Sequence, residues 1–367
     1  MTTQREQQIL DIVQQNPLIA QQTLADQLGI SRSAVAVHLM NLMQKGEILG
    51  KGYVIAPKKQ VLVVGGANMD ISGNLSIEPQ AGDSTPGQVL TSAGGVARNI
   101  AENLARLGHK VKLLTALGND IYGQKLLEHT QQAGVDMSDS WILNQSPTST
   151  YLSIHLPDGN MLAAVNDMAI LEEINSARLQ EKQDKLKNAS CVVLDCNLSP
   201  ASLEYLFSQV QNAAVFVDTV SAVKCQRILP WLEWVHTLKP NRLEAETLTG
   251  ISLDHPKQAP IVAQALHDKG VKQVVLSFAE LGLFFSHHKG EQFWQNPIPA
   301  QIMNVTGAGD ALCAGLVHGF FDNLSSVQTM QFASACAAFT ASTHATNHPS
   351  LSKAAIQHLL KQHYPNH

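Results

Sequence analysis

The stretch Asn304-Val305-Thr306-Gly307-Ala308-Gly309-Asp310 has residue types and spacing suited to group transfer. An apolar run at 311–317 follows and predicts a helix. Glycines at a helix start leave backbone N–H groups unshielded, and their partial positive charge suits a phosphate. Asp310 can accept a proton from a nucleophile while these amides hold the transferred group. The alternative is a glycine turn in which Asp310 only stabilises the helix start.

Polar pairs also follow several apolar runs, where the strands of a parallel sheet would end. They are Asn68-x-Asp70, Asn166-Asp167, Asp195-x-Asn197, Asp218 and Asn241-x-x-Glu244. Ligands bind at the carboxyl ends of strands in such sheets, although Asn and Asp also favour loops and helix caps. Together with the glycine turn, the pairs favour a polar substrate and a nucleotide. The sequence contains neither the P-loop motif nor, after its first strand, the Rossmann glycine motif.

The chain from residue 61 onward alternates short apolar runs with helical patterns. A continuous run such as 61–64 predicts a strand buried on both faces. The expected strands are 61–64, 111–115, 191–195, 214–217, 237–238 and 273–277, and the expected helices are 96–107, 122–133, 200–211, 257–269, 308–321, 327–343 and 353–361. This order predicts an α/β fold with a doubly wound, mainly parallel sheet over residues 61–367. Segments 71–92 and 148–166 predict a small β-lid over the site, or alternatively two surface hairpins.

Residues 1–56 predict a separate small domain, joined to the large one by a linker at 57–60. Three helical patterns end near Gly46, and 48–55 could form a strand pair. This order, with the phrase Leu24-Ala25-Asp26-Gln27-Leu28-Gly29-Ile30-Ser31, resembles a winged helix-turn-helix, whose third helix enters the major groove of DNA. The resemblance implies DNA contacts by Ser31, Arg32, Ser33 and His38. Cations are few, so DNA affinity should be weak; the alternative is a protein-interaction module.

The composition sets further bounds. The net charge of −5 gives no overall basic field for nucleic acid. No apolar stretch is long enough for a membrane span, so no membrane partner is expected. The five cysteines form no C-x-x-C pair and are expected to be buried hydrophobes in a reducing compartment, which predicts the cytoplasm.

Three motifs in order resemble one enzyme family. Residues 94–108, Gly94-Gly95-Val96-Ala97-Arg98-Asn99 onward, resemble the first signature of the ribokinase-like (PfkB) sugar and nucleoside kinases. Residues 305–310 resemble the second signature, and Asn241-Arg242-Leu243-Glu244 resembles the metal-associated N-x-x-E motif. Within the family the chain is most similar to bacterial pseudouridine kinases, through phrases at 66–70, 83–87, 164–168, 195–197 and 236–248.

The resemblance implies transfer of the γ-phosphoryl group of ATP to the 5′-hydroxyl of pseudouridine. Asp310 would be the general base, and the amides of Gly307, Ala308, Gly309 and Asp310 would form the anion hole. The implied substrate contacts are Asn68, Asp70, Gly95 and Asn99 on the sugar and Asn166 on the base, and the implied ATP contacts are Asn197, Lys239, Ser277, Gly282, Thr306 and Asn347. Asn241 and Glu244 would hold Mg²⁺, largely through water. The resemblance also implies a homodimer formed through the lid.

Two departures from the family pattern affect this interpretation. Many relatives carry Asp at the position of Asn304, where it contributes to a monovalent-cation site, so the neutral amide weakens the case for K⁺. Val96 replaces a lysine of many ribokinases, which favours a nucleoside over free ribose. The group that reads the nucleobase stays open among Ser72, Thr148, Thr150, His155 and Asn166. The alternatives are a kinase for another nucleoside or sugar, or a DNA-binding regulator that senses a metabolite; the intact Asp310 and Glu244 argue against a pure sensor.

Overall fold

The computed structural model describes residues 2–49 and 60–364, which form two compact units, Met1–Lys58 and Lys59–His367. The first unit has three helices, α1 (Gln4–Gln15), α2 (Gln21–Leu28) and α3 (Arg32–Gln44), around an apolar core that includes Ile9, Leu24 and Val35. Helices α1 and α3 begin at polar caps; in α3 the hydroxyl of Ser31 accepts a hydrogen bond from the N–H of Ala34 (3.1 Å). The strand pair expected through 48–55 and the linker at 57–60 lie almost entirely outside the described residues.

The second unit is built on an eight-stranded sheet with the order β14-β13-β12-β11-β10-β9-β1-β4. The strands are β1 (Gln60–Val64), β4 (Lys110–Leu114), β9 (Cys191–Asp195), β10 (Ala214–Asp218), β11 (Thr237–Lys239), β12 (Gln273–Ser277), β13 (Leu283–His287) and β14 (Gln292–Gln295). The strands from β4 to β12 in this order are parallel, whereas β13 and β14 extend the sheet as an antiparallel hairpin. The predicted doubly wound, mainly parallel sheet is therefore confirmed. The hairpin was not predicted, because an edge hairpin breaks the alternation of strand and helix.

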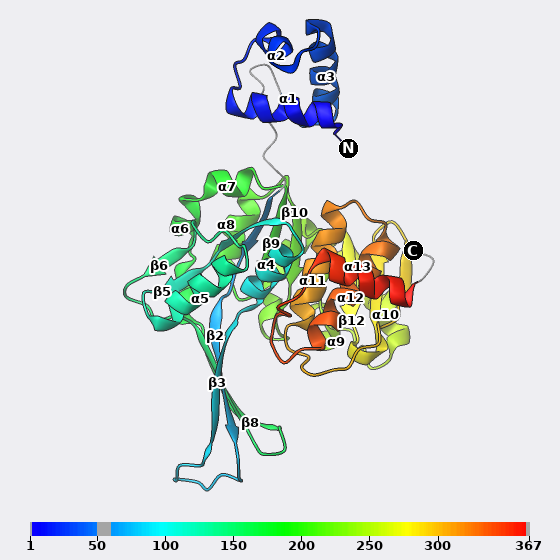
Figure 1. Ribbon diagram of the computed structural model, residues 1–367. Helices are drawn as coiled ribbons and strands as arrows, with labels where there is room; N and C mark the ends of the chain where they lie inside the picture. The colour runs from blue at the N-terminus through cyan, green and yellow to red at the C-terminus, as the bar shows by residue number, and fades with distance from the viewer. Residues whose placement is uncertain (1, 50–59, 365–367) are drawn as a thin grey trace. The chain divides into compact units, whose positions relative to one another are not determined.

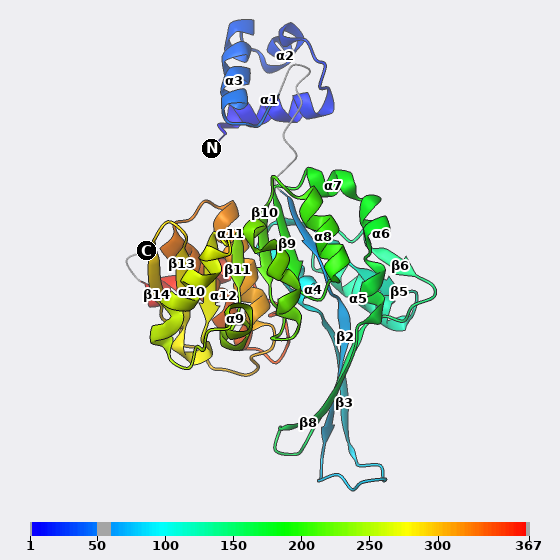
Figure 2. The same cartoon turned by 180° about the vertical axis from the view of Figure 1, so that it is seen from behind.

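Helices cover both faces of this sheet (Figures 1 and 2). One face carries α4 (Val96–Arg106), α5 (Ile121–Gln132), α11 (Ala308–Phe321), α12 (Ser326–Ala341) and α13 (Lys353–His363), and the other carries α6 (Ser176–Gln180), α7 (Gln183–Lys187), α8 (Pro200–Gln209), α9 (Arg242–Thr249) and α10 (Ala259–Asp268). Successive residues of β9 alternate between the two cores: Cys191 and Val193 join one, Val192 and Leu194 the other. Burial on both faces explains why these strands are continuously apolar in sequence.

A second, four-stranded sheet, which we call the lid, has the order β3-β2-β7-β8. Its strands are β2 (Asn68–Leu75), β3 (Gly87–Gly94), β7 (Thr150–His155) and β8 (Met161–Asp167). β2 and β7 begin beside the main sheet and β3 and β8 end there, and the far part of the lid projects away from the rest of the unit (Figure 1). A small parallel pair, β5 (Ala116–Gly118) and β6 (Trp141–Leu143), was not predicted because strands of this length carry too short a pattern.

All five cysteines are buried and unpaired, in agreement with their prediction as small core residues. Cys191 and Cys313, for example, both belong to the core shared by α4 and α11. Within residues 2–49 and 60–364, no helix has the length and hydrophobicity that a bilayer crossing needs.

Candidate active site

Helix α11 begins at a sharp glycine turn. Gly307, its N-cap residue, has a φ of +82°, and a Cβ there would lie 1.9 Å from the carbonyl oxygen of Thr346. The N–H of Ala308 donates to the carbonyl of Val305 (3.3 Å), whereas the N–H groups of Gly307, Gly309 and Asp310 have no acceptor among the described residues. Three of the four predicted anion-hole amides are therefore free at the positive end of a 14-residue helix.

The carboxyl group of Asp310 lies in the first turn of this helix and is buried, with 8% of the residue exposed. Its Oδ2 accepts a hydrogen bond from Nδ2 of Asn99 (2.7 Å). Burial away from water, reinforced by the nearby carboxylate of Asp218, raises the pKa of Asp310 to about 8, against the opposing effects of Asn99 and Lys239. A pKa near the operating pH is what a general base requires.

The predicted sugar contacts gather where the lid meets α4. Nδ2 of Asn68 donates to Oδ1 of Asp70 (2.6 Å), and burial raises the pKa of Asp70. A Cβ on Gly94 would lie 2.2 Å from Oδ2 of Asp70, and a Cβ on Gly95, where φ is +100°, would lie 2.5 Å from the Cα of Ala67. Both glycines are thus needed for the close approach of β2 to the start of α4. Asn99, one turn further along α4, then reaches Asp310.

Arg98 connects these groups, and the sequence analysis gave it no role. Its guanidinium is 1% exposed and donates to the carbonyls of Ala93 (3.0 Å) and Gly94 (2.9 Å), to Oε2 of Glu102 (2.6 Å), and to the side chains of Asn99 and Asn347. Arg98 lies inside the first signature, but an arginine in a helical pattern normally predicts a solvated face. Only the packing reveals that it orients Asn99, which contacts the candidate base.

A second buried cluster lies at the ends of β10 and β11. Nζ of Lys239 is 3.0 Å from Oδ2 of Asp218, and a Cβ on Gly309 would lie 3.5 Å from the same Nζ. Burial opposes the charge of Lys239, but the carboxylate of Asp218 outweighs it and holds the pKa of Lys239 above its usual value. The cation therefore stays charged beside the amide cradle. Asp218 is one of the polar strand ends recognised in the sequence, where its pattern predicted no specific role.

The two predicted metal ligands form a reciprocal cap at the start of α9. Oδ1 of Asn241 accepts from the N–H of Glu244 (3.0 Å), and Oε2 of Glu244 accepts from the N–H of Asn241 (2.8 Å) and the hydroxyl of Thr219 (2.5 Å). Oε1 of Glu244 and the second lone pair on Oδ1 of Asn241 remain available to a ligand. Asp218 contributes a further buried carboxylate. The charges of Asp218 and Glu244 both act on Lys239 and raise its pKa. Carboxylate and amide oxygens of this kind suit a hydrated Mg²⁺ ion.

The predicted ATP contacts are spread around the carboxyl edge of the main sheet. Asn197 follows β9, and its Oδ1 accepts from Nζ of Lys224 (2.6 Å). Ser277 ends β12, Gly282 forms the turn into β13 with a φ of +95°, and Thr306 precedes the α11 turn. Asn347 differs from the expectation, because both ends of its amide are engaged, by Arg98 (2.9 Å) and by the carbonyl of Asn99 (2.9 Å).

Asn304 joins two segments by hydrogen bonds. Its Nδ2 donates to the carbonyl of His344 (3.0 Å), and its Oδ1 accepts from the N–H of Thr306 (2.9 Å). The amide thereby links the loop before α11 to the loop after α12. A carboxylate could not donate the first of these bonds.

The register of the lid decides which side chains share the face of Asp70. Asp70 pairs with Ser92 and Tyr151, and Tyr151 pairs with Asn166, so these four lie in one row across the sheet. Asn166 is therefore on the Asp70 face. Thr148, another candidate for reading the nucleobase, is buried, and its hydroxyl is engaged with Asp120 (2.8 Å) and the N–H of Gly118 (2.9 Å).

The predicted DNA contacts lie at the start of α3 in the first unit. Ser31 is occupied as the helix cap and is 2.9 Å from the hydroxyl of Ser33. Arg32 is exposed and has no partner among the described residues, while Nδ1 of His38 is buried without one. Lys45 is neutralised by Glu6 at 2.7 Å. Among the Lys and Arg residues of 2–49, Arg32 is thus the one without a hydrogen bond or ion pair, which leaves it free for a phosphate.

Two protein-family models match this chain, one over the second unit and one over the first. The model of the pfkB family of carbohydrate kinases matches residues 58–354, and that of a winged helix-turn-helix DNA-binding domain matches residues 3–48. In Escherichia coli K12, the uncharacterized sugar kinase YeiI is 42% identical over 348 residues (95% of this chain, 96% of YeiI), and the pseudouridine kinase is 41% identical over 304 residues (83% and 97%). The structure of a carbohydrate kinase from Agrobacterium tumefaciens superposes with a TM-score of 0.73 at 26% identity, covering 82% of this chain and 97% of that one.

These matches confirm the resemblance inferred from the motifs and the winged helix-turn-helix assigned to the first unit. The alignment with YeiI is longer than the second unit and so extends into the first. The alignment with the pseudouridine kinase is no longer than the second unit. The two relatives are equally similar to this chain, so similarity alone does not choose the substrate.

Proposed function

This chain belongs to the pfkB family of carbohydrate kinases, and from that premise we propose that it transfers the γ-phosphoryl group of ATP to the 5′-hydroxyl of pseudouridine. The observation that carries the proposal is the buried carboxyl of Asp310 at a helix start with three free amides, hydrogen-bonded to Asn99. A base and an anion cradle within one turn suit phosphoryl transfer to a hydroxyl. The 41% identity to the pseudouridine kinase of E. coli supports the substrate.

In this mechanism Asp70 and Asn68 bind the sugar hydroxyls, and Asn99 orients Asp310. Asp310 accepts the proton of the 5′-hydroxyl while the 5′-oxygen attacks the γ-phosphorus. The bond between the γ-phosphorus and the oxygen of ADP breaks in the same step. The N–H groups of Gly307, Gly309 and Asp310 and the ammonium of Lys239 stabilise the charge on the transferred group. Mg²⁺, which the oxygens of Asn241, Glu244 and Asp218 fit, would offset the charge of the phosphates when bound.

The substrate is tested by comparing turnover of pseudouridine, uridine, ribose and fructose with ATP. We expect kcat/KM for pseudouridine to exceed that for uridine by about 10²-fold or more, because pseudouridine presents a ring N–H that uridine lacks and a polar group left unpaired discriminates strongly. Asn166, on the Asp70 face of the lid, is the proposed reader, so Asn166→Ala should reduce this ratio. Leu162→Ala, on the same exposed strand, is the control. Equal turnover of both nucleosides would contradict the proposal.

A second candidate is a pfkB kinase for another nucleoside or a sugar, favoured by the 42% identity to YeiI, which is named a sugar kinase. The same panel decides, because this candidate expects the highest kcat/KM on ribose, fructose or uridine. A regulator that only senses a metabolite expects no turnover on any of them.

We propose that the first unit binds DNA through α3, with Arg32 on a phosphate. Because Arg32 is the unpaired cation among residues 2–49, Arg32→Ala in the full chain should weaken binding to a fragment upstream of its own gene and lower the salt slope of log K by about 1. Arg5→Ala removes the same charge from α1, where Arg5 already bonds Gln8 (3.0 Å), and is the control. Equal salt slopes for wild type and Arg32→Ala in a fluorescence-anisotropy titration would exclude this contact.

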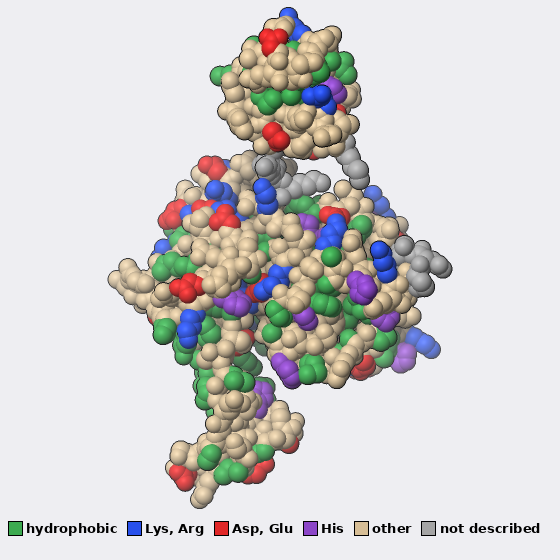
Figure 3. Space-filling view, viewed as in Figure 1, with side chains coloured by type: hydrophobic (Ala, Val, Ile, Leu, Met, Phe, Trp, Pro, Cys, Tyr) green, Lys and Arg blue, Asp and Glu red, His purple; other side chains and the backbone are tan. Residues whose placement is uncertain are grey.

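We propose a homodimer formed through the face of the lid opposite Asp70. Leu152 and Val165 pair across this face and Val89 shares it, with 38%, 62% and 71% of each residue exposed; Figure 3 shows apolar side chains on the lid. Val165→Glu should convert the dimer to a monomer, and light scattering measures the change. The reason is that burying an unpaired charge in an apolar interface costs on the order of several kcal/mol. Val327→Glu on α12 is the control. A monomeric wild type would contradict the proposal.

A further inference from the structure

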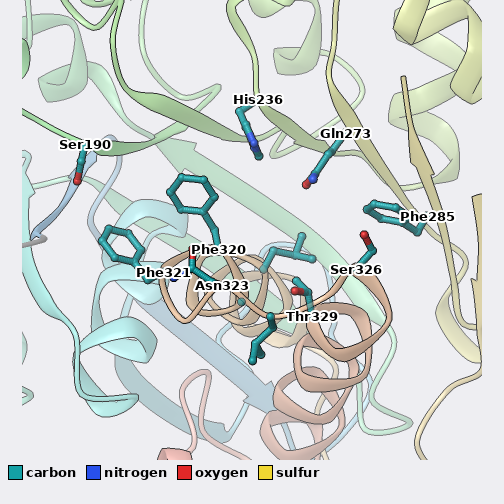
Figure 4. Close-up of a pocket in the computed structure, with 12 residues that line it drawn as sticks. Ser190, His236, Gln273, Phe285, Phe320, Phe321, Asn323, Ser326 and Thr329 are labelled. Atoms are coloured by element: carbon teal, nitrogen blue, oxygen red, sulfur yellow. The ribbon is translucent and has the colours of Figure 1, made fainter. Parts of the chain in front are cut away.

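A cavity of about 500 Å³ lies at the edge of the main sheet opposite the catalytic groups. His236 immediately precedes β11 and Gln273 begins β12, whereas Lys239 and Ser277 end these strands on the catalytic side. The last turn of α11 and the start of α12 complete the walls (Figure 4). The volume is that of a small-molecule site, and no residue assigned to the kinase reaction lines it.

The polar wall of the cavity has a defined pattern of hydrogen-bond donors and acceptors. The hydroxyl of Thr237 donates to Oε1 of Gln273 (3.1 Å), so its oxygen is left to accept the hydrogen on Nδ1 of His236 (2.8 Å). Burial, aided by the charge of Lys272, lowers the pKa of His236 to about 4, which keeps the ring neutral near pH 7. Nε2 of His236 is therefore a bare acceptor, and the Nε2 amide of Gln273 is a donor.

The side chains of His236 and Gln273 point into the cavity toward α11 in Figure 4. The Nε2 atom of each has no hydrogen-bond partner in the described part of the chain. Aromatic rings form the adjacent wall. The ring of Phe320 is 38% exposed and lies edge-on to those of Phe216 (5.6 Å) and His236 (5.3 Å). Phe285 lies across the cavity (Figure 4). An exposed phenylalanine beside a donor and an acceptor suits a flat ring with a polar edge.

We propose that this cavity binds a planar heterocycle that carries a ring N–H next to a carbonyl, as in uracil. The N–H donates to Nε2 of His236, and the carbonyl accepts from Nε2 of Gln273, while the ring packs against Phe320. The wall of the cavity and the candidate base share α11, which holds Asp310 in its first turn and Phe320 in its last. A ligand here thus contacts the helix that carries Asp310 without touching the sugar contacts.

The test is binding of free uracil to the full chain by equilibrium dialysis, with 1,3-dimethyluracil as the matched probe. The methylated ring keeps its plane and carbonyls but carries methyl groups in place of the N–H hydrogens, so we expect affinity to fall at least about tenfold, the effect of one lost hydrogen bond. This comparison needs no altered protein. His236→Phe keeps the aromatic contacts and removes the acceptor, and a similar loss is expected. His288→Phe, an exposed neighbour, is the control and should bind uracil as the wild type does.

Asn166→Ala distinguishes this cavity from the catalytic site, where a free base could also bind through the lid. We expect Asn166→Ala to bind uracil with unchanged affinity. Loss of binding in Asn166→Ala with retention in His236→Phe would overturn the proposal. Equal binding of uracil and 1,3-dimethyluracil, or no binding of uracil at millimolar concentration, would overturn it as well.

Discussion

Asp310→Asn is expected to lower kcat by about 10²–10⁴-fold, the usual contribution of a general base. The substitution keeps the shape of the side chain and removes its ability to take the proton of the attacking hydroxyl. The sugar contacts of Asn68 and Asp70 are unaltered, so nucleoside affinity should change little. Steady-state kinetics and calorimetric titration with nucleoside separate these two quantities.

Asp322→Asn is the matched control, because Asp322 caps the other end of α11 and is ion-paired with Lys353. It should leave kcat near the wild-type value. Turnover retained by Asp310→Asn would remove Asp310 as the base. For the wild type, kcat/KM should rise with pH, reach half of its maximum near pH 8 and level off above it, because the carboxyl must be ionised to act and burial raises its pKa to about 8.

The same raised pKa predicts that Asp310→Asn stabilises the fold at neutral pH. The unfolded carboxyl has its ordinary pKa of 3.8 and the folded one a pKa of about 8, so the folded protein binds the additional proton between these values. The unfolding free energy of the wild type therefore falls as pH rises from about 4 to about 8. The variant lacks this loss, so its Tm advantage should grow over that range and then stay constant. A Tm difference independent of pH would show that Asp310 does not carry the shift.

Gly307→Ala is expected to lower both stability and turnover. The left-handed φ of +82° is strained for alanine by about 1–3 kcal/mol, and the added Cβ would meet the carbonyl of Thr346 at 1.9 Å. The turn must move to relieve this contact and would carry the free amides with it. Loss of one oxyanion donor costs about 10²–10³ in kcat, so we expect at least that reduction. Thermal unfolding and steady-state kinetics measure the two effects.

Gly290→Ala separates backbone strain from the clash. Gly290 has a φ of +101°, but a Cβ there would meet nothing within 4 Å. This control should lose a similar amount of stability from strain and keep its kcat. If Gly307→Ala resembled Gly290→Ala in both measurements, the close packing of the α11 turn on the 346 loop would have no role in catalysis.

The sequence alone determined the class of fold and the ends of its main helices. The range 308–321 of α11 was predicted without error, because a glycine turn, a polar residue and an unbroken apolar run are all local signals. The strands of the parallel core were likewise placed within a residue or two, since burial on both faces demands continuous apolar runs. The motifs at 94–108, 241–244 and 305–310 led to the family by resemblance.

Other features depend on contacts between residues far apart in the chain, and only the tertiary structure decided them. Arg98 is buried because Asn347, 249 positions away, and the carbonyls at the lid base surround it. The pKa of Asp310 is raised because its carboxyl is buried away from water and because Asp218, from another strand, lies near it. The acceptor on His236 and the donor on Gln273 come to the same cavity only because β11 and β12 are neighbours in the sheet. Local patterns predict secondary structure, whereas burial and charge are properties of the assembled core.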